Sequence, residues 1–237
     1  MDLLLFGAFP YMALALFVAG TIYRYKRGFK YSSLSSQLLE TEKLFSASLA
    51  FHIGIIAIFL GHLIGFIAPS LFSSIGGSML VILETLGVMF GVLATVGLVM
   101  LLYRRVTNDR IKVVTNRMDI AIEILLIIQF IIGVIIAIEM KWGSSWYASN
   151  MVPYLHSIFS FQPDIAGISA MKPLVQAHVV GAFLIIALIP FSRLVHFLVA
   201  PFHYITRPLQ VVRWYWNPKT IRDSSRQWQD VQRPKNN

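Results

Sequence analysis

Four histidines lie inside two long apolar segments of the chain. His52 and His62 belong to one segment, in the motifs F-H-I-G and G-H, and His178 and His196 belong to another, in H-V-V-G and R-L-V-H. An ionisable side chain is costly to place in the middle of a membrane-spanning helix, so such residues are functional candidates by default. Two imidazoles on each of two helices indicate two bis-histidine metal centres stacked across a membrane.

The composition indicates a membrane protein. Of the 237 residues, 57% are hydrophobic and only 13% are charged, which is above the apolar share of ordinary globular domains. A helix needs about 20 apolar residues to cross the roughly 30 Å hydrocarbon layer. Five stretches are long enough, and they lie near Leu3–Tyr23, Phe45–Ala68, Met79–Tyr103, Ile120–Glu139 and Leu174–Ala200. The sequence therefore predicts an all-α, polytopic bundle of five transmembrane helices.

The chain is expected to form one membrane domain over residues 1–212, followed by a basic tail over residues 213–237 that is partly disordered. The first apolar stretch lacks the basic leading region and the small-residue cleavage pattern of a removable signal peptide. It is therefore expected to be a retained span.

The distribution of basic residues predicts the orientation. The net charge of +9 could indicate nucleic-acid binding, but all of the 20 Lys and Arg except Lys141 and Lys172 fall in two of the four loops or between Arg193 and the end of the chain. Cytoplasmic loops carry such an excess of positive charge. We expect the N-terminus outside, the C-terminus in the cytoplasm, and a location in the cell membrane.

The residues outside the spans add two expectations. Zero cysteines exclude an iron–sulfur cluster held by this chain, a thiolate-bound metal and covalently attached c-type haem. The segment from Lys141 to Pro173 is expected to be an interfacial lid, and His156 and His203 ordinary interfacial residues. An aromatic girdle at headgroup level is predicted in the lid, from Trp142, Trp146, Tyr147, Tyr154, Phe159 and Phe161.

Antiparallel helices would pair the four histidines by level, His52 with His196 near the cytoplasm and His62 with His178 near the outside. His178 and His196 are 18 residues apart in the sequence and share one face of a continuous helix. The separations along the two helices agree less well. His52 and His62 would be about 15 Å apart along their helix, but His178 and His196 would be about 27 Å apart along theirs. Tilt, or ligation at differing heights, would have to absorb this mismatch.

Haem b is the metal centre that fits two imidazoles best. Imidazole suits zinc, copper and iron, but two ligands leave zinc undersupplied, whereas a haem needs only axial ligands. Arg193 is a candidate partner for haem propionates, although a boundary arginine is more often a snorkelling residue. Gly54, Gly61 and Gly65 leave room for a macrocycle or, more commonly, for a neighbouring helix. A single membrane histidine often only hydrogen-bonds a neighbouring helix.

Taken together, these residues resemble the gamma subunit of respiratory nitrate reductase, a dihaem cytochrome b membrane anchor, up to about Val212. The resemblance rests on P-Y at Pro10, R-Y at Arg24, S-S-Q-L-L-E ending at Glu40, L-A-F-H-I-G ending at Gly54, G-H at His62, Y-R-R ending at Arg105, H-x-x-G at His178 and P-F-S-R-L-V-H ending at His196. Together these motifs are specific, although none is specific alone.

The resemblance implies that His52 and His196 ligate the iron of a cytoplasmic-side haem b, and that His62 and His178 ligate an outer haem b. It also implies oxidation of menaquinol or ubiquinol near the outer haem. Electrons would pass to a cytoplasmic iron–sulfur beta subunit and then to a molybdenum alpha subunit that reduces nitrate.

One position departs from the family pattern. The family often has a lysine, thought to contact the quinone, near the outer start of the third helix, where Val81 stands here. Glu84 is the nearest ionisable residue and a weak candidate for accepting a quinol proton, although it could simply pair with a neighbouring helix. Gly61, beside His62, is a candidate for the quinol neighbourhood.

Two other functions are also compatible with the sequence. One is a related dihaem cytochrome b serving a sulfite-reduction or heterodisulfide-type complex. The other is a haem-free membrane anchor or a metal transporter, although a transporter would more naturally use broken helices with carboxylates at mid-depth.

Overall fold

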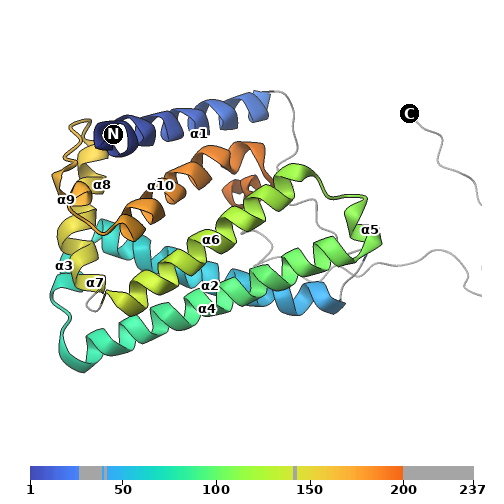
Figure 1. The fold of residues 1–237 in the computed structure, drawn as a ribbon, viewed down its shortest axis with the longest axis horizontal. Coiled ribbons are helices and arrows are strands. Elements are labelled where there is room, and N and C mark those ends of the chain that lie inside the picture. Colours follow the sequence, from blue (N-terminus) through green and yellow to red (C-terminus); the bar gives the residue numbers. More distant parts are fainter. Residues whose placement is uncertain (27–38, 40–41, 141–142, 200–237) are drawn as a thin grey trace, which may run out of the picture. The chain divides into compact units, whose positions relative to one another are not determined.

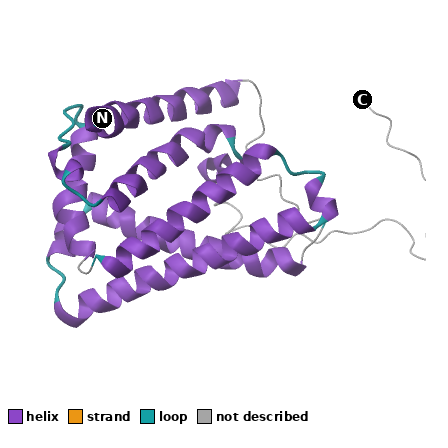
Figure 2. Cartoon of the chain, viewed as in Figure 1, coloured by secondary structure: helices purple, strands orange, loops and turns teal. Residues whose placement is uncertain are grey.

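The computed structural model describes residues 1–26, 39, 42–140 and 143–199. The chain divides into two units, Met1–Val199 and Ala200–Asn237, and the second lies outside the described residues. The expectations for Trp142, His203 and the tail of residues 213–237 therefore fall on residues that are not described. All regular structure in the described residues is helical (Figure 2).

Within the described residues, five long apolar helices confirm the predicted multi-pass membrane fold. The first span joins η1 (Leu3–Ala8) to α1 (Phe9–Lys26). The others are α2 (Glu42–Ile67), α4 (Gly77–Thr107), α6 (Arg117–Glu139) and α10 (Pro173–Leu188). Helices suit this setting because they satisfy their backbone hydrogen bonds internally, where lipid offers no partners.

The long helices pack in the order α2, α4, α6, α10, α1, and Figure 1 shows α6 lying between α4 and α10. The closest approach joins α2 to α4. A Cβ at Gly54 would lie 2.6 Å from the backbone nitrogen of Ala94, so only glycine permits this crossing. Helices α2 and α10 do not pack extensively on each other in the part of the chain that the structure describes.

The predicted continuous helix from Leu174 to Ala200 is wrong. Helix α10 ends at Leu188 and is followed by two short 3₁₀ segments, η3 (Ile189–Phe191) and η4 (Arg193–Val199). Between them Ser192 is extended, with φ −116° and ψ 177°. Pro190 explains the break, because proline has no N–H and its ring clashes with the carbonyl four residues earlier. In Figure 1 the segment after α10 turns away from the α10 axis.

Short helices cover one end of the bundle: α7 (Gly143–Trp146), η2 (Tyr147–Met151), α8 (Val152–Phe159) and α9 (Ala166–Ser169). We call this the lid end. They share a buried core with the ends of the spans, formed by Phe6, Ile136, Met151, Tyr154, Ile158, Ile168 and Val175. The predicted lid is therefore a packed cap.

One member of the predicted aromatic girdle, Tyr154, is buried rather than exposed. Tyr154 is only 2% exposed and donates a 2.8 Å hydrogen bond to the carbonyl of Phe6. Phe159 and Phe161 are exposed, as a girdle requires.

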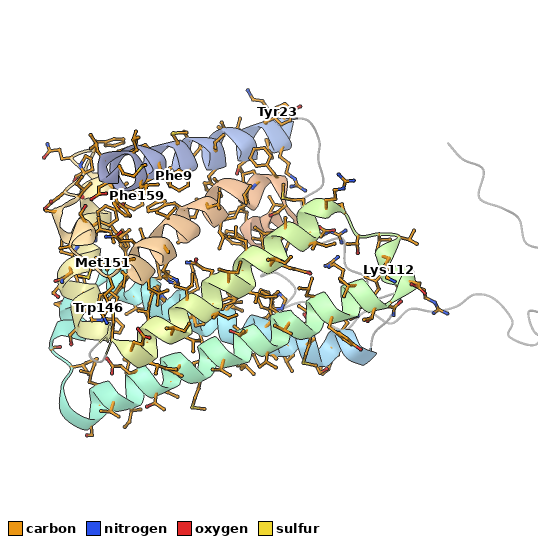
Figure 3. All side chains as sticks on the ribbon, in the orientation of Figure 1. Phe9, Tyr23, Lys112, Trp146, Met151 and Phe159 are labelled. Carbon is orange, nitrogen blue, oxygen red and sulfur yellow. The ribbon has the colours of Figure 1, made fainter. Side chains whose placement is uncertain are left out.

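The opposite end carries Arg105, Lys112 and Arg193, and we call it the basic end. Helix α5 (Asp109–Lys112) also lies at this end. The short helix α3 (Pro69–Ser73) follows α2. Figure 3 shows Lys112 at one end and Trp146, Met151 and Phe159 gathered at the other. Helix α6 begins at the basic end with a capping box, in which Asn116 and Asp119 each accept the other's backbone N–H.

Candidate metal centres

Two of the four histidines meet near the basic end, although they come from elements far apart in the sequence. His52 lies on α2 and His196 on η4, and their ring centres are 6.3 Å apart with an angle of 63° between the ring planes. The structure therefore brings together the pair that antiparallel levels predicted.

Backbone hydrogen bonds fix which ring nitrogen each imidazole leaves available. The Nδ1 atom of His52 lies 2.7 Å from the carbonyl oxygen of Ser48, and that of His196 lies 2.7 Å from the carbonyl oxygen of Arg193. Since a carbonyl can only accept, each Nδ1 carries the proton and each Nε2 has a free lone pair. Metal-binding histidines commonly use their second ring nitrogen in this way.

The spacing of the two rings matches one shared metal. An imidazole–metal bond is about 2.0 Å, and the ring centre lies roughly 1.1 Å behind the bonding nitrogen, so two imidazoles that share one metal would have centres at most about 6.2 Å apart. The observed separation is 6.3 Å. Among the described residues no three His, Cys, Asp or Glu gather to hold a metal ion. The two imidazoles of His52 and His196 therefore suit a metal whose remaining ligands come from a bound group rather than from the protein.

The second pair, His62 and His178, lies toward the lid end. His62 on α2 is exposed, and its Nδ1 lies 2.9 Å from the carbonyl oxygen of Ile58, which again leaves Nε2 available. His178 on α10 is half-buried. No contact between the rings of His62 and His178 is found in the described part of the chain, so their pairing stays a prediction.

Helix α6 shapes the surroundings of His178. A Cβ at Gly133 would lie 3.1 Å from Cε1 of His178, so the absent side chain makes room for the ring. Gln129 donates a 2.7 Å hydrogen bond to the carbonyl of His178. The Nδ1 atom of His178 is buried and has no hydrogen-bond partner in the described part of the chain. An unsatisfied buried nitrogen is costly, which is consistent with a ligand at this position.

The break after α10 removes the mismatch in helix rise. Because the chain changes direction at Ser192, the 18 residues from His178 to His196 do not form one straight helix. The expected separation of about 27 Å along a single axis therefore does not apply.

Arg193, the candidate partner for propionates, is engaged by protein groups. Its Nε lies 2.8 Å from Oδ1 of Asp119, and its terminal nitrogen donates to the carbonyl of Val114. Nearby, Arg105 forms a 2.8 Å ion pair with Glu123. These contacts join α4, α6 and η4 at the basic end.

The quinol candidates lie along α2 and α4. A Cβ at Gly61 would meet no atom within 4 Å, so space is open beside His62. One carboxylate oxygen of Glu84 is buried without a hydrogen-bond partner among the described residues. Val81 is 58% exposed and offers no polar group.

The lid contributes contacts that sequence reasoning missed. The hydroxyl of Tyr147 donates a 3.1 Å hydrogen bond to the carbonyl of His62, and its ring centre lies 5.5 Å from that of His62. His156, expected to be an ordinary interfacial residue, places Nε2 3.0 Å from the carbonyl oxygen of Phe66. Burial raises the pKa of Tyr147 to about 12, so its hydroxyl stays protonated at neutral pH. No spacing pattern in the sequence indicated either contact.

Comparisons with known proteins agree over almost the whole chain. The family model described as nitrate reductase gamma subunit matches residues 2–215. The chain is 33% identical over 218 residues to the nitrate reductase gamma chain of Bacillus subtilis, covering 89% of this chain and 97% of that one. It is 32% identical over 220 residues to the respiratory nitrate reductase 2 gamma chain of Escherichia coli, covering 90% and 97%.

Proposed function

The chain belongs to the nitrate reductase gamma subunit family, whose members are membrane-anchoring subunits of respiratory nitrate reductase, and we propose that it binds two haem b groups and oxidises a membrane quinol. The family assignment favours nitrate reductase over the sulfite-reduction and heterodisulfide-type alternatives. It leaves the haem-free anchor to be excluded by experiment.

The geometry of His52 and His196 is the observation that carries the proposal. Their ring centres are 6.3 Å apart and each Nδ1 is hydrogen-bonded to a backbone carbonyl, so the two Nε2 atoms are the ones that would hold a haem iron. Bound there, haem b would supply a reversible one-electron couple. The carbonyls of Ser48 and Arg193 hold the two imidazoles in place and keep the ring proton on each Nδ1.

His62 and His178 are proposed to hold the second group, nearer the lid. The support is the Nδ1 hydrogen bond of His62, which leaves its Nε2 available, and the space that Gly133 leaves for the His178 ring. The lid hydroxyl of Tyr147 fixes the turn of α2 that carries His62.

Quinol oxidation is proposed beside His62, with menaquinol or ubiquinol as the substrate. Gly61 leaves open space there. The buried, unpartnered oxygen of Glu84 makes this carboxylate a candidate acceptor for a quinol hydroxyl proton. Val81 cannot replace the polar contact of the family lysine, so the quinol would be held by other groups.

We place the lid end on the outer face and the basic end in the cytoplasm, following the positive-inside rule. The partners would be an iron–sulfur beta subunit and a molybdenum alpha subunit docked at the basic end. Protons released at the outer face, with electrons delivered inward, would make the step electrogenic.

A quinol-reduction assay tests this function. A reduced soluble quinol analogue is added to anaerobic membranes holding the assembled complex, and the reduced b-type absorption band is followed. Wild type should be reduced rapidly, and His62→Ala should lose this reduction together with the outer haem. Wild type with haem that the quinol cannot reduce would contradict the proposal.

A further inference from the structure

The segment that carries His196 cannot be positioned by helix geometry alone. It follows the break at Pro190 and is a short 3₁₀ turn. The carbonyls freed by the break have a partner on α1, since Arg24 donates to the carbonyl of Pro190 at 2.6 Å and to that of Ser192 at 3.1 Å. Helix α1 thus secures the backbone of the break just before Arg193.

A buried carboxylate secures the next residue from the other side. Asp119 is 2% exposed, and its Oδ1 lies 2.8 Å from Nε of Arg193. Its second oxygen accepts the backbone N–H of Asn116 at 2.9 Å. Arg105 also lies within 3.7 Å. A buried carboxylate is stable only when paired and hydrogen-bonded, and this ion pair restrains the Arg193 side chain together with its hydrogen bond to the Val114 carbonyl.

Arg193 links this carboxylate to the imidazole. Its side chain is held by Asp119, and its backbone carbonyl accepts the Nδ1 proton of His196 at 2.7 Å. A shift of the Arg193 backbone would therefore change the hydrogen bond that orients the His196 ring. The ring in turn faces His52 at a 63° angle between planes.

We propose that Asp119 is a positioning residue that acts through Arg193 to set the orientation of the His196 imidazole relative to His52, and with it the ligand field of the iron between them. The proposal rests on the proposed haem site. Second-partner contacts of this kind orient metal ligands and tune the bound metal in other proteins.

Electron paramagnetic resonance distinguishes a positioning role from a merely structural one, because a merely structural role would not change the g values. In a low-spin ferric haem with two axial imidazoles, the largest g value depends on the angle between the two ring planes. His196→Ala identifies the signal of this haem by its loss. Asp119→Asn removes the charge that holds Arg193 while keeping nearly the same shape.

Two control variants separate positioning from other roles of Asp119. Glu123→Gln removes one charge from the same cluster, where Glu123 pairs with Arg105. Asn116→Ala removes the cap that Asn116 provides to the Asp119 N–H and leaves the carboxylate on Arg193. Arg193→Lys, which keeps the charge but loses the planar fork, replaces Asp119→Asn if that variant does not accumulate.

The measurement uses the full-length chain in membranes, with haem content determined in parallel. We expect Asp119→Asn to retain two haems and to shift the largest g value of the His196 signal, while both controls keep the wild-type value. Two haems with unchanged g values in Asp119→Asn, or an equal shift in Glu123→Gln, would overturn the positioning role and leave the haem assignment standing. A wild-type chain without haem would instead overturn the proposed function.

Discussion

The α2–α4 crossing gives a prediction whose size follows from the structure. In Gly54→Ala, the new Cβ would lie 2.6 Å from the Ala94 nitrogen and 2.7 Å from the Phe90 oxygen. Both are backbone atoms, so no side-chain rotation relieves the contact. Because ordinary contact begins at 3.4 Å, the helices must separate by ~0.8 Å, an overpacking that typically costs ~1–3 kcal/mol.

Gly61→Ala is the matched control, because it makes the same change on the same helix where a Cβ meets no atom within 4 Å. Replacing glycine in a helix interior gains up to about 1 kcal/mol. Thermal unfolding of the purified chain in detergent should therefore show a lower midpoint for Gly54→Ala and an unchanged or higher one for Gly61→Ala. Equal midpoints for the two variants would refute the close crossing that holds α2, and with it His52 and His62, against α4.

Three further outcomes are expected. Gly133→Leu should lose one of the two haems, because a Cβ there already lies 3.1 Å from Cε1 of His178. Gly87→Leu is the control and should keep both haems, because a Cβ there meets nothing within 4 Å. Equal haem content in the two variants would contradict this. Burial raises the pKa of Tyr147 and of Tyr154 to about 12. Since the folded chain holds these protons more tightly, the free energy of unfolding should fall as pH rises from about 10 to about 12, with the full contribution present below that range. Replacing both tyrosines with Phe should flatten the profile, and a wild-type-like slope would count against the assignment. Tyr154→Phe should lower the free energy of unfolding by about 1 kcal/mol, because it leaves the Phe6 carbonyl without its donor; denaturant unfolding that matches wild type would contradict this.

The spans and the four histidines could be predicted because both signals are local. Each long apolar run must become a helix in lipid, and an imidazole within such a run stands out by its cost. The level of each histidine then follows from the direction of its helix, which predicts the pairing of His52 with His196 that the ring contact confirms.

The break at Pro190 could not be placed from apolar patterning, because apolar residues continue beyond it through Phe191, Leu194 and Val195. Proline is tolerated in transmembrane helices when other groups satisfy the freed backbone, and here Arg24 on α1 does so. The pairing of Asp119 with Arg193 joins residues from two different elements. It depends on tertiary packing that no spacing along the chain reveals. The same holds for the contact between Tyr147 and His62.

Counting haem per chain tests the central claim most directly. Pyridine haemochrome quantification, together with a dithionite-reduced minus oxidised spectrum of the purified full-length chain, should give two b-type haems for wild type. His52→Ala and His178→Ala should each retain one. A wild-type chain without haem, or two spectrally normal haems in either variant, would contradict ligation by these imidazoles.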